Sequence, residues 1–166
     1  MVWNGIKEKP HRLGPSNDIG FIRCDFTAKL RGRQQFFNNP STFSRHEAIL
    51  LTSLATHDCD AALYMFMPDH VHIVLQGRSD ESDVRSCMAD FKQRSGYELS
   101  QSREGVARWQ KDFYDRILRD ESEYRRKLNY ILMNPIRAGL AVSWKEYPYW
   151  GSTLYSKDDL LMGAKY

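Results

Sequence analysis

Residues 61–77 have the sequence AALYMFMPDHVHIVLQG and predict a β-hairpin. Two runs rich in aromatic and β-branched residues, AALYMFM and HVHIVLQ, flank Pro68 and Asp69, and Gly77 ends the second run. A proline followed by an aspartate between two such runs is typical of a tight turn. The apolar residues on both sides of this turn place the two strands at the centre of a sheet.

The segments around this hairpin predict the remaining elements of a ferredoxin-like fold. Residues 18–30 and 113–118 have the composition of strands. Residues 43–57, 79–100 and 120–135 have the pattern of helices. The order β-α-β-β-α-β, followed by one further helix towards the C-terminus, therefore predicts an α+β protein with a ferredoxin-like antiparallel sheet.

Several residues are expected to fix the ends of these helices. Ser41 or Thr42 is expected to cap the first helix, and acidic residues are expected in the first turn of the second, where the helix dipole favours them. Asp120 and Glu123 have the spacing of a capping box at the start of the third helix. Glu123 and Lys127 are spaced for an i,i+4 ion pair.

The size and composition of the chain are those of one globular domain. It has 166 residues, of which 42% are apolar and 27% are charged, with a formal net charge of +3. This predicts a single domain over residues 1–166, with a peripheral arm at 1–18 and a C-terminal tail at 154–166, and excludes a disordered chain. We expect no membrane span and no secretion signal, and three widely spaced cysteines suit the cytoplasm.

The small net charge conceals three segments of opposite sign. Residues 1–45 carry eight basic and three acidic side chains, residues 46–102 carry four and nine, and residues 103–145 carry ten and six. Two basic segments around an acidic one can form an anion-binding surface if they fold onto one face. A solvated exterior is the alternative explanation of these counts.

His70 and His72 are the first candidate functional residues. Because strand side chains alternate between faces, both imidazoles point to one side of the sheet and Val71 points to the other. Two imidazoles about 7 Å apart along a strand can hold one divalent cation. A pair of hydrogen-bonded sheet histidines without a metal is the alternative.

Tyr130 and Asn134 form the second candidate pair, near the end of a helix that Pro135 is expected to close. Their four-residue spacing puts them on one helix face. Asn134 can serve as an oxygen ligand or as a helix-end residue before a proline. For Tyr130 the alternative is packing, the ordinary role of a helical tyrosine. Basic side chains beside this pair, which fit a phosphate group or a solvated face, are Arg125, Arg126 and Lys127.

Together the two pairs predict chemistry at a phosphate. A divalent cation held by His70 and His72, with Asn134 as a third ligand, would polarise a phosphate oxygen next to Tyr130. A tyrosine has an ordinary pKa of about 10 and is a poor nucleophile unless its phenolate is stabilised. A phosphotyrosine keeps the bond energy that hydrolysis discards, which suits reversible transfer of a DNA strand.

Three separated motifs carry a resemblance to a known family. They are YMFMPDHVHIVL at residues 64–75, WQKDFYDRILRDESEYRRKLNYILMNPIRAGL at residues 109–140 and EYPYWGST at residues 146–153. In this order they resemble the HUH single-tyrosine transposases of small insertion sequences, and in particular the REP-associated tyrosine transposases. The resemblance covers about residues 19–153.

This resemblance implies a fold related to the RNA-recognition motif (RRM-like), Mg²⁺ or Mn²⁺ at the histidine pair, and a catalytic C-terminal helix. It implies cleavage and rejoining of single-stranded DNA beside imperfect hairpins, through a 5′-phosphotyrosine and a free 3′-hydroxyl. The family roles transfer to His70 and His72 as metal ligands, to Tyr130 as nucleophile and to Asn134 as third ligand. The expected partners are hairpin DNA of the nucleoid and, in a homodimer, a second copy of the chain; a monomer is equally compatible.

Basic and aromatic side chains are expected to contact the DNA. Neutralising several phosphates makes such binding depend steeply on salt, and aromatic rings can stack on unpaired bases. The basic residues expected at phosphates are Lys29, Arg31, Arg33, Arg116, Arg119, Arg125, Arg126 and Arg137. The aromatic candidates are Phe36, Phe37, Trp109, Phe113 and Tyr114, whereas the run from Trp144 to Trp150 is expected to cover the sheet or a core edge.

Two other classes of protein compete with a transposase. The first is a non-catalytic, domesticated module that only binds hairpin nucleic acid, against which the intact His70, His72 and Tyr130 weigh. The second is a small-molecule metallohydrolase, which would leave Tyr130 unexplained and would need further histidine or carboxylate ligands at recognisable spacing.

Overall fold

In the computed structural model, which describes residues 18–102 and 107–163, the chain folds around a five-stranded antiparallel sheet with the order β4-β1-β3-β2-β5. Its strands are β1 (Arg23–Lys29), β2 (Cys59–Met67), β3 (His70–Gly77), β4 (Tyr114–Ile117) and β5 (Trp150–Gly151). Its helices are η1 (Arg31–Arg33), α1 (Pro40–Thr56), α2 (Val84–Gln101), α3 (Glu121–Leu132), α4 (Asn134–Arg137) and α5 (Lys157–Gly163). The order β1-α1-β2-β3-α2-β4 along the chain is the predicted one, which confirms the α+β, ferredoxin-like sheet.

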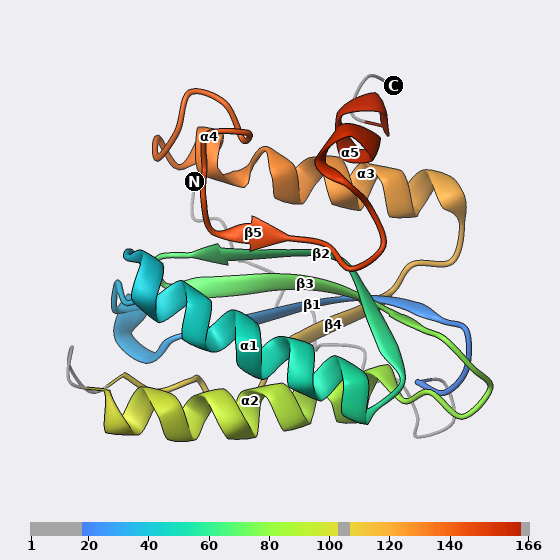
Figure 1. Cartoon of the computed structure of the whole chain (residues 1–166), viewed down its shortest axis with the longest axis horizontal. Coiled ribbons are helices and arrows are strands. Elements are labelled where there is room, and N and C mark those ends of the chain that lie inside the picture. The colour runs from blue at the N-terminus through green and yellow to red at the C-terminus, as the bar shows by residue number, and fades with distance from the viewer. Residues whose placement is uncertain (1–17, 103–106, 164–166) are drawn as a thin grey trace, which may run out of the picture.

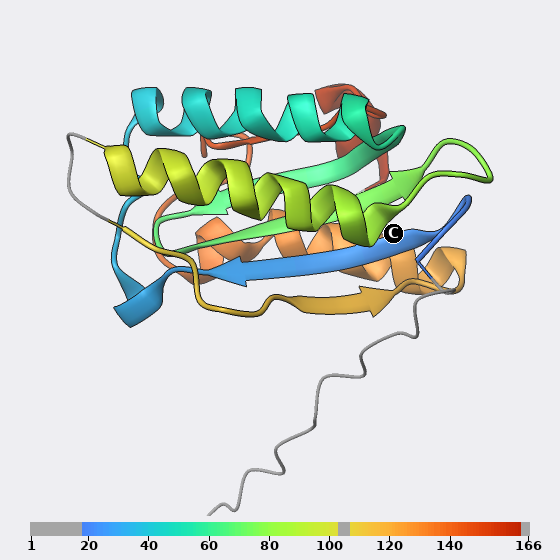
Figure 2. The same cartoon turned by 90° about the horizontal axis from the view of Figure 1, so that it is seen from below.

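The sheet separates two layers of helices. Helices α1 and α2 cover one face, whereas α3, α4 and α5 lie on the other (Figure 1). Seen from below, α1 and α2 run side by side in front of the sheet, with β4 at the edge beyond β1 (Figure 2). Each face has its own hydrophobic core, and Tyr149, just before β5, packs against both.

The alternation of side chains along β3 decides where the histidines point. Val71, Ile73 and Leu75 enter the core under α1 and α2, whereas Val74 belongs to the core under α3. Because successive side chains point to opposite faces, His70 and His72 lie on the α3 face. The predicted hairpin is therefore confirmed, and its histidines face the late helix.

The start of the described chain differs from the prediction in two respects. Residues 1–17 of the expected arm lie outside the described residues, and Asp18, the last residue of that arm, is buried. The first strand begins only at Arg23. The cap of α1 is Asn39, whose side chain accepts a hydrogen bond from the backbone N–H of Thr42. The predicted cap at Ser41 or Thr42 is thus wrong, because Pro40 fits the first helical position and moves the cap back to Asn39.

Helix α2 also begins later than predicted. Its cap is Asp83, which accepts a hydrogen bond from the backbone N–H of Ser86, and the first turn holds no acidic residue. The expected acidic first turn is therefore wrong. The acidic residues precede the helix, and Asp83 compensates the exposed N–H groups as a cap instead.

The predictions for the start of α3 are partly correct. Asp120 caps the helix and accepts from the backbone N–H of Glu123. The Glu123 carboxylate accepts from the backbone N–H of Arg119 and pairs with Arg116, so neither the reciprocal half of the capping box nor the expected ion pair with Lys127 forms. Lys127 instead reaches the sheet, as described below.

Pro135 does not end the helix that carries Tyr130. Helix α3 ends at Leu132, and after Met133 the chain continues as the short helix α4, in which Pro135 is the second residue. A proline near a helix start needs no N–H partner, so Pro135 favours a new helix rather than a stop. Tyr130 and Asn134 therefore belong to two successive helices.

The C-terminal segment pairs with the sheet and packs into the core on the α3 face. Strand β5 pairs with β2, and the Tyr147 hydroxyl donates to the carbonyl of Phe66 at 2.6 Å. The expected role of the run from Trp144 to Trp150 is confirmed, since Trp144 and Tyr147 are buried in the second core. The predicted tail at 154–166 contains α5, whose Leu160 is buried there too.

None of the helices within residues 18–102 and 107–163 is both long enough and apolar enough to cross a membrane.

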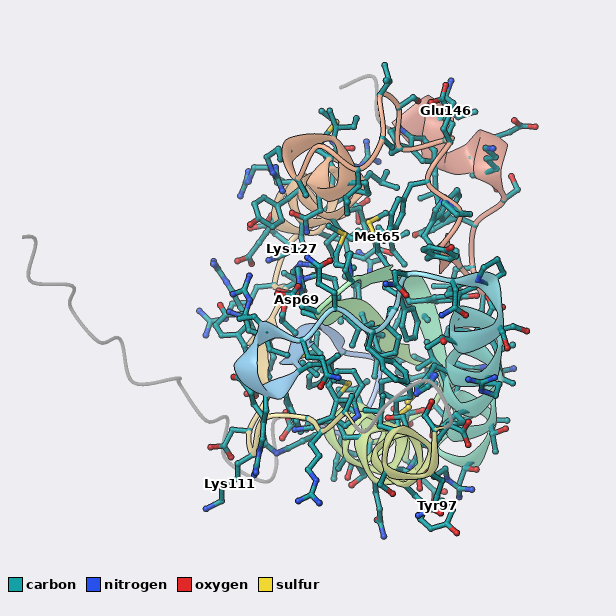
Figure 3. The ribbon with its side chains drawn as sticks, turned by 90° about the vertical axis from the view of Figure 1, so that its left-hand side faces the viewer. Met65, Asp69, Tyr97, Lys111, Lys127 and Glu146 are labelled. Atoms are coloured by element: carbon teal, nitrogen blue, oxygen red, sulfur yellow. The ribbon has the colours of Figure 1, made fainter. Side chains whose placement is uncertain are left out.

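A buried ion pair joins α3 to the sheet. Asp25 on β1 is 0% exposed, and its Oδ2 lies 2.7 Å from Nζ of Lys127. Figure 3 shows Lys127 between α3 and the sheet. Burial raises the pKa of Asp25, while the Lys127 ammonium opposes that rise. Because an unpaired buried carboxylate is very unfavourable, this contact fixes α3 on the sheet face.

We expect Lys127→Met to destabilise the protein by about 3–5 kcal/mol, because it leaves the Asp25 carboxylate buried without a partner. Urea denaturation measures this loss. Removal of the ammonium raises the pKa of folded Asp25 further above its unfolded value, so the variant should regain stability as the pH falls and the carboxyl is protonated. The double variant Asp25→Val/Lys127→Met should recover most of the loss. A double variant as unstable as Lys127→Met would contradict this role.

Candidate active site

The two histidines of β3 form a compact pair on the α3 face. Their ring centroids are 4.9 Å apart, and the rings are nearly perpendicular. His72 is buried at 8% exposure, whereas His70 lies partly exposed at the turn. Strand β1 runs alongside, with Thr27 opposite His72 and Lys29 opposite His70. The pair thus has a buried end and an open end.

Each histidine is oriented by a partner at its Nδ1 atom. Nδ1 of His72 lies 3.0 Å from Oγ1 of Thr27, and Nδ1 of His70 lies 2.6 Å from Oδ1 of Asp69. In both rings the Nε2 atom is therefore the nitrogen left for a further ligand. Metal-binding histidines have this arrangement, in which a hydrogen bond at one nitrogen orients the other.

Both histidines favour the neutral form. Burial lowers the pKa of His70, although Asp69 acts in the opposite direction. Burial lowers the pKa of His72 to about 3, and the positive charges of Lys127, Lys29 and Arg137, together with His70, add to this effect. A neutral imidazole is the form that binds a metal, so the site needs little deprotonation at neutral pH.

Tyr130 lies beside this pair in the same chain. Its ring centroid is 6.4 Å from that of His72, the two rings are perpendicular, and the residue is 49% exposed. The guanidinium carbon of Arg137 lies 4.0 Å from the centre of the Tyr130 ring, and Nζ of Lys127 lies 5.1 Å from it. The predicted approach of the late-helix phenol to the histidines is therefore observed, with two cations around the ring.

Asn134 has an amide that is partly engaged. Its Oδ1 accepts a hydrogen bond from Nη2 of Arg137 at 2.8 Å, and the same nitrogen donates to the backbone carbonyl of Tyr130 at 2.7 Å. The amide nitrogen of Asn134 is buried and has no hydrogen-bond partner among the residues that the structure describes. Its role as a third metal ligand stays a prediction, because its oxygen would have to turn from Arg137 to the cation.

The donor set fits a divalent cation with open positions. Two neutral imidazoles offer Nε2, and Asn134 offers an amide oxygen. Within the described ranges 18–102 and 107–163, no group of three histidine, cysteine or acidic side chains could hold a metal ion. A cation at the histidine pair would therefore be completed by oxygen ligands from the amide, water or substrate, as is usual for Mg²⁺ and Mn²⁺.

The predicted basic residues fall into two groups. Lys29, Arg31 and Arg33 lie on β1 and η1, at the end of the sheet that carries His70, and Arg137 lies over Tyr130. The second group consists of Arg116 on β4, Arg119 between β4 and α3, and Arg125 and Arg126 on α3, the last two about one helical turn before Tyr130. Most of its members have partners on the protein, Arg116 with Glu123, Arg125 with Glu121 and Arg126 with Ser122, while Arg119 is exposed.

Trp109 is a core residue, which corrects its assignment to the DNA surface. It is 7% exposed, its Nε1 donates to Oγ of Ser95 at 2.9 Å, and its ring stacks on Phe37. Phe36 and Phe37 are likewise buried, and Phe113 packs against the same core. Of the aromatic candidates, Tyr114 on β4 is exposed. Trp109 therefore serves the fold.

The site contains residues that the sequence did not single out. Thr27 and Asp69 orient the histidines, and Lys127 lies against the Tyr130 ring. Arg108 lies next to η1, where its carbonyl accepts from the backbone N–H of Arg31 at 2.8 Å. The position of Asp69 directly before His70 was a usable signal. Thr27 and Arg108 required the pairing of strands and loops far apart in the sequence.

Comparison with known families gives one model that spans the site's scaffold. The model, whose description is transposase IS200 like, matches residues 23–129, well over half of the chain. The matched stretch includes β1, the β2–β3 hairpin with both histidines, and most of α3. It ends one residue before Tyr130.

Similar proteins include two REP-associated tyrosine transposases. The one from Escherichia coli K12 is 23% identical over 126 residues, which are 75% of this chain and 72% of that protein. The one from Haemophilus influenzae is 25% identical over 99 residues, 50% of this chain and 53% of that protein, so the match spans about half of its length. A solved structure of a REP-associated tyrosine transposase bound to a REP hairpin has a TM-score of 0.71 at 17% identity and covers 84% of this chain and 81% of that chain. Its likeness supports the fold.

Proposed function

Because the chain belongs to the family of IS200-like transposases, we propose that it is a metal-dependent enzyme that cleaves and rejoins single-stranded DNA near hairpins. This membership confirms the resemblance predicted from the three sequence motifs. The proposal assigns Tyr130 as the nucleophile, His70 and His72 as metal ligands and Asn134 as the third ligand. Mg²⁺ and Mn²⁺ are the proposed cofactors.

The proximity of Tyr130 to the histidine pair carries this proposal. A phenol whose ring centroid lies 6.4 Å from that of His72, on an exposed helix face, can reach a phosphate that also contacts a cation at the histidines. The ring is half-exposed and contacts two cationic side chains, Lys127 and Arg137, which can also attract a phosphate. The same proximity weighs against a small-molecule metallohydrolase, which has no use for Tyr130.

The bound cation would polarise a non-bridging oxygen of the scissile phosphate. The phenolic oxygen of Tyr130 attacks phosphorus, its proton leaves to solvent, and the bond from phosphorus to the 3′-oxygen breaks. The 3′-oxygen takes up a proton and becomes a free hydroxyl, while the 5′-phosphate stays on Tyr130. Attack by another 3′-hydroxyl reverses these steps and rejoins the DNA. Lys127 and Arg137 stabilise negative charge that develops on the phenolic oxygen and the phosphate.

Hairpin DNA is the substrate that the comparisons favour, since the structural neighbour is bound to a REP hairpin. In this chain the basic residues of η1 and the end of β1 lie at the open end of the histidine pair. We therefore assign Lys29, Arg31 and Arg33 to the phosphates nearest the cleavage site. The second group, Arg116, Arg119, Arg125 and Arg126, is assigned to phosphates along β4 and the first turns of α3.

Tyr130→Phe should abolish the covalent protein–DNA adduct while DNA binding is retained, because only the attacking oxygen is removed. The measurement is denaturing electrophoresis after incubation with a panel of labelled single-stranded hairpins and Mg²⁺ or Mn²⁺. Tyr97→Phe, at an exposed tyrosine on α2, is the matched control and should keep the adduct. An undiminished adduct in Tyr130→Phe would reject Tyr130 as nucleophile. Gel shifts without any adduct in the wild type would favour the non-catalytic binding module.

His72→Ala should lose at least about 10- to 100-fold in Mn²⁺ affinity, the range already seen when only the support of a metal ligand is removed. Electron paramagnetic resonance of free Mn²⁺ measures this directly, and cleavage should fall in parallel. His57→Ala at the end of α1, paired with Asp90 away from the site, is the control. If the wild type cleaves DNA as well in excess chelator as it does with Mg²⁺ or Mn²⁺, the proposed role of the metal is wrong.

A further inference from the structure

Building on the proposed function, we propose that Asp69 is a positioning residue of the cation site, shared between His70 and Arg33. In this arrangement the positive charge of Arg33 neutralises part of the negative charge with which the Asp69 carboxylate acts on His70. A DNA phosphate that draws Arg33 away would then strengthen the site, so that DNA and cation bind cooperatively.

The two oxygens of Asp69 serve two different partners. Oδ1 lies 2.6 Å from Nδ1 of His70, and Oδ2 forms an ion pair with Nε of Arg33. The Asp69 side chain is only 15% exposed, so water competes weakly for either oxygen. A carboxylate that accepts from the distal nitrogen of a ligating imidazole orients the ring and makes it a better metal ligand.

The backbone around Asp69 is held independently of this side-chain contact. The carbonyl of Asp69 accepts from the backbone N–H of Leu30 at 2.9 Å. The carbonyl of Pro68 accepts hydrogen bonds from the backbone N–H groups of Phe36 and Phe37 at 2.7 and 3.1 Å. Figure 3 shows Asp69 beside the short helix η1, drawn in pale blue. The turn and the segment after β1 thus form one unit, and replacing the Asp69 carboxylate should leave its backbone in place.

The conformation of η1 presents Arg33 to solvent. Gly32 and Arg33 have φ angles of 63° and 55°, in the left-handed region that residues other than glycine rarely adopt. A non-glycine residue in that region persists only where its surroundings hold it. The Arg33 side chain is 66% exposed even though it contacts Asp69. Its guanidinium can therefore bind a phosphate without any rearrangement of the core.

Electrostatics determine whether a phosphate at Arg33 strengthens or weakens cation binding at the histidines. With Arg33 paired to Asp69, a positive charge lies close to His70 and neutralises the carboxylate that supports it. With Arg33 engaged by a phosphate, the full negative charge of Asp69 acts on His70 and on a cation at its Nε2. By linkage, a cation at the histidines must favour DNA binding by the same factor.

Substitutions that keep shape but remove charge test this proposal through Mn²⁺ affinity, measured by electron paramagnetic resonance without DNA. Asp69→Asn should weaken Mn²⁺ binding by about 10- to 100-fold, the range for a lost support of a metal ligand. Arg33→Gln should tighten it by about fivefold, the lower end of ordinary coupling between sites. Lys111→Gln removes one exposed positive charge from the segment that follows the Gln110 N–H bond to the carbonyl of Lys29, without touching Asp69, and should leave the affinity nearly unchanged.

A double variant separates coupling through Asp69 from simple repulsion between Arg33 and the cation. In the Asp69→Asn background, Arg33→Gln should lose its tightening effect, because non-additivity reports a shared pathway. Equal effects of Arg33→Gln in both backgrounds, or equal effects of Arg33→Gln and Lys111→Gln, would overturn the role of Asp69. Circular dichroism melts establish that each variant is folded.

The cooperativity with DNA is measured with the labelled hairpin that the wild type binds best, in a Tyr130→Phe background that prevents covalent reaction. The ratio of hairpin affinity in Mn²⁺ to that in chelator should be about fivefold larger when Arg33 is present than after the Arg33→Gln substitution. Equal ratios would overturn the coupling. Loss of Mn²⁺ binding in Asp69→Asn together with unchanged binding in His72→Ala would instead refute the proposed metal site itself, so the two failures are distinguishable.

Discussion

The ion pair between Asp25 and Lys127 is the contact on which the geometry of the site depends. Apolar burial of α3 is non-directional and would tolerate small shifts of the helix along the sheet. A charge pair with a fully buried carboxylate does not tolerate such shifts, because each displacement would leave Asp25 without its partner. Lys127 is three residues before Tyr130, so fixing the ammonium also fixes the phenol beside His72.

The site combines a rigid buried side with an open side. His72 and Asp25 lie under α3, where their positions are held by Thr27 and Lys127. His70 and Tyr130 lie towards solvent, where a DNA strand can approach. Burial keeps the imidazoles neutral and ready to bind a cation, while exposure lets the tyrosine reach a phosphate. Both conditions follow from placing the histidines at the end of a central strand.

Sequence patterns predicted the parts of the molecule that local interactions govern. The hairpin, the order of the first four strands and the cap at Asp120 depend on residues close together in the chain, and all three are observed. The expected pair of Glu123 and Lys127 failed because Glu123 is engaged by Arg116 and the backbone N–H of Arg119, while Lys127 pairs with the buried carboxylate of Asp25 on β1. Trp109 was misassigned because composition cannot distinguish a ring that stacks on bases from one that stacks on Phe37.

The sequence alone determined the chemistry that is present: two histidines on one strand face, a tyrosine on a late helix, and basic residues in two segments. It also determined the family, because three motifs in a fixed order are more specific than any one of them. Only the tertiary structure decided that Tyr130 approaches His72 of its own chain, and that Thr27 and Asp69 orient the two imidazoles. Those contacts join residues from separate strands and helices, and their register is set by packing of the whole sheet rather than by any local pattern.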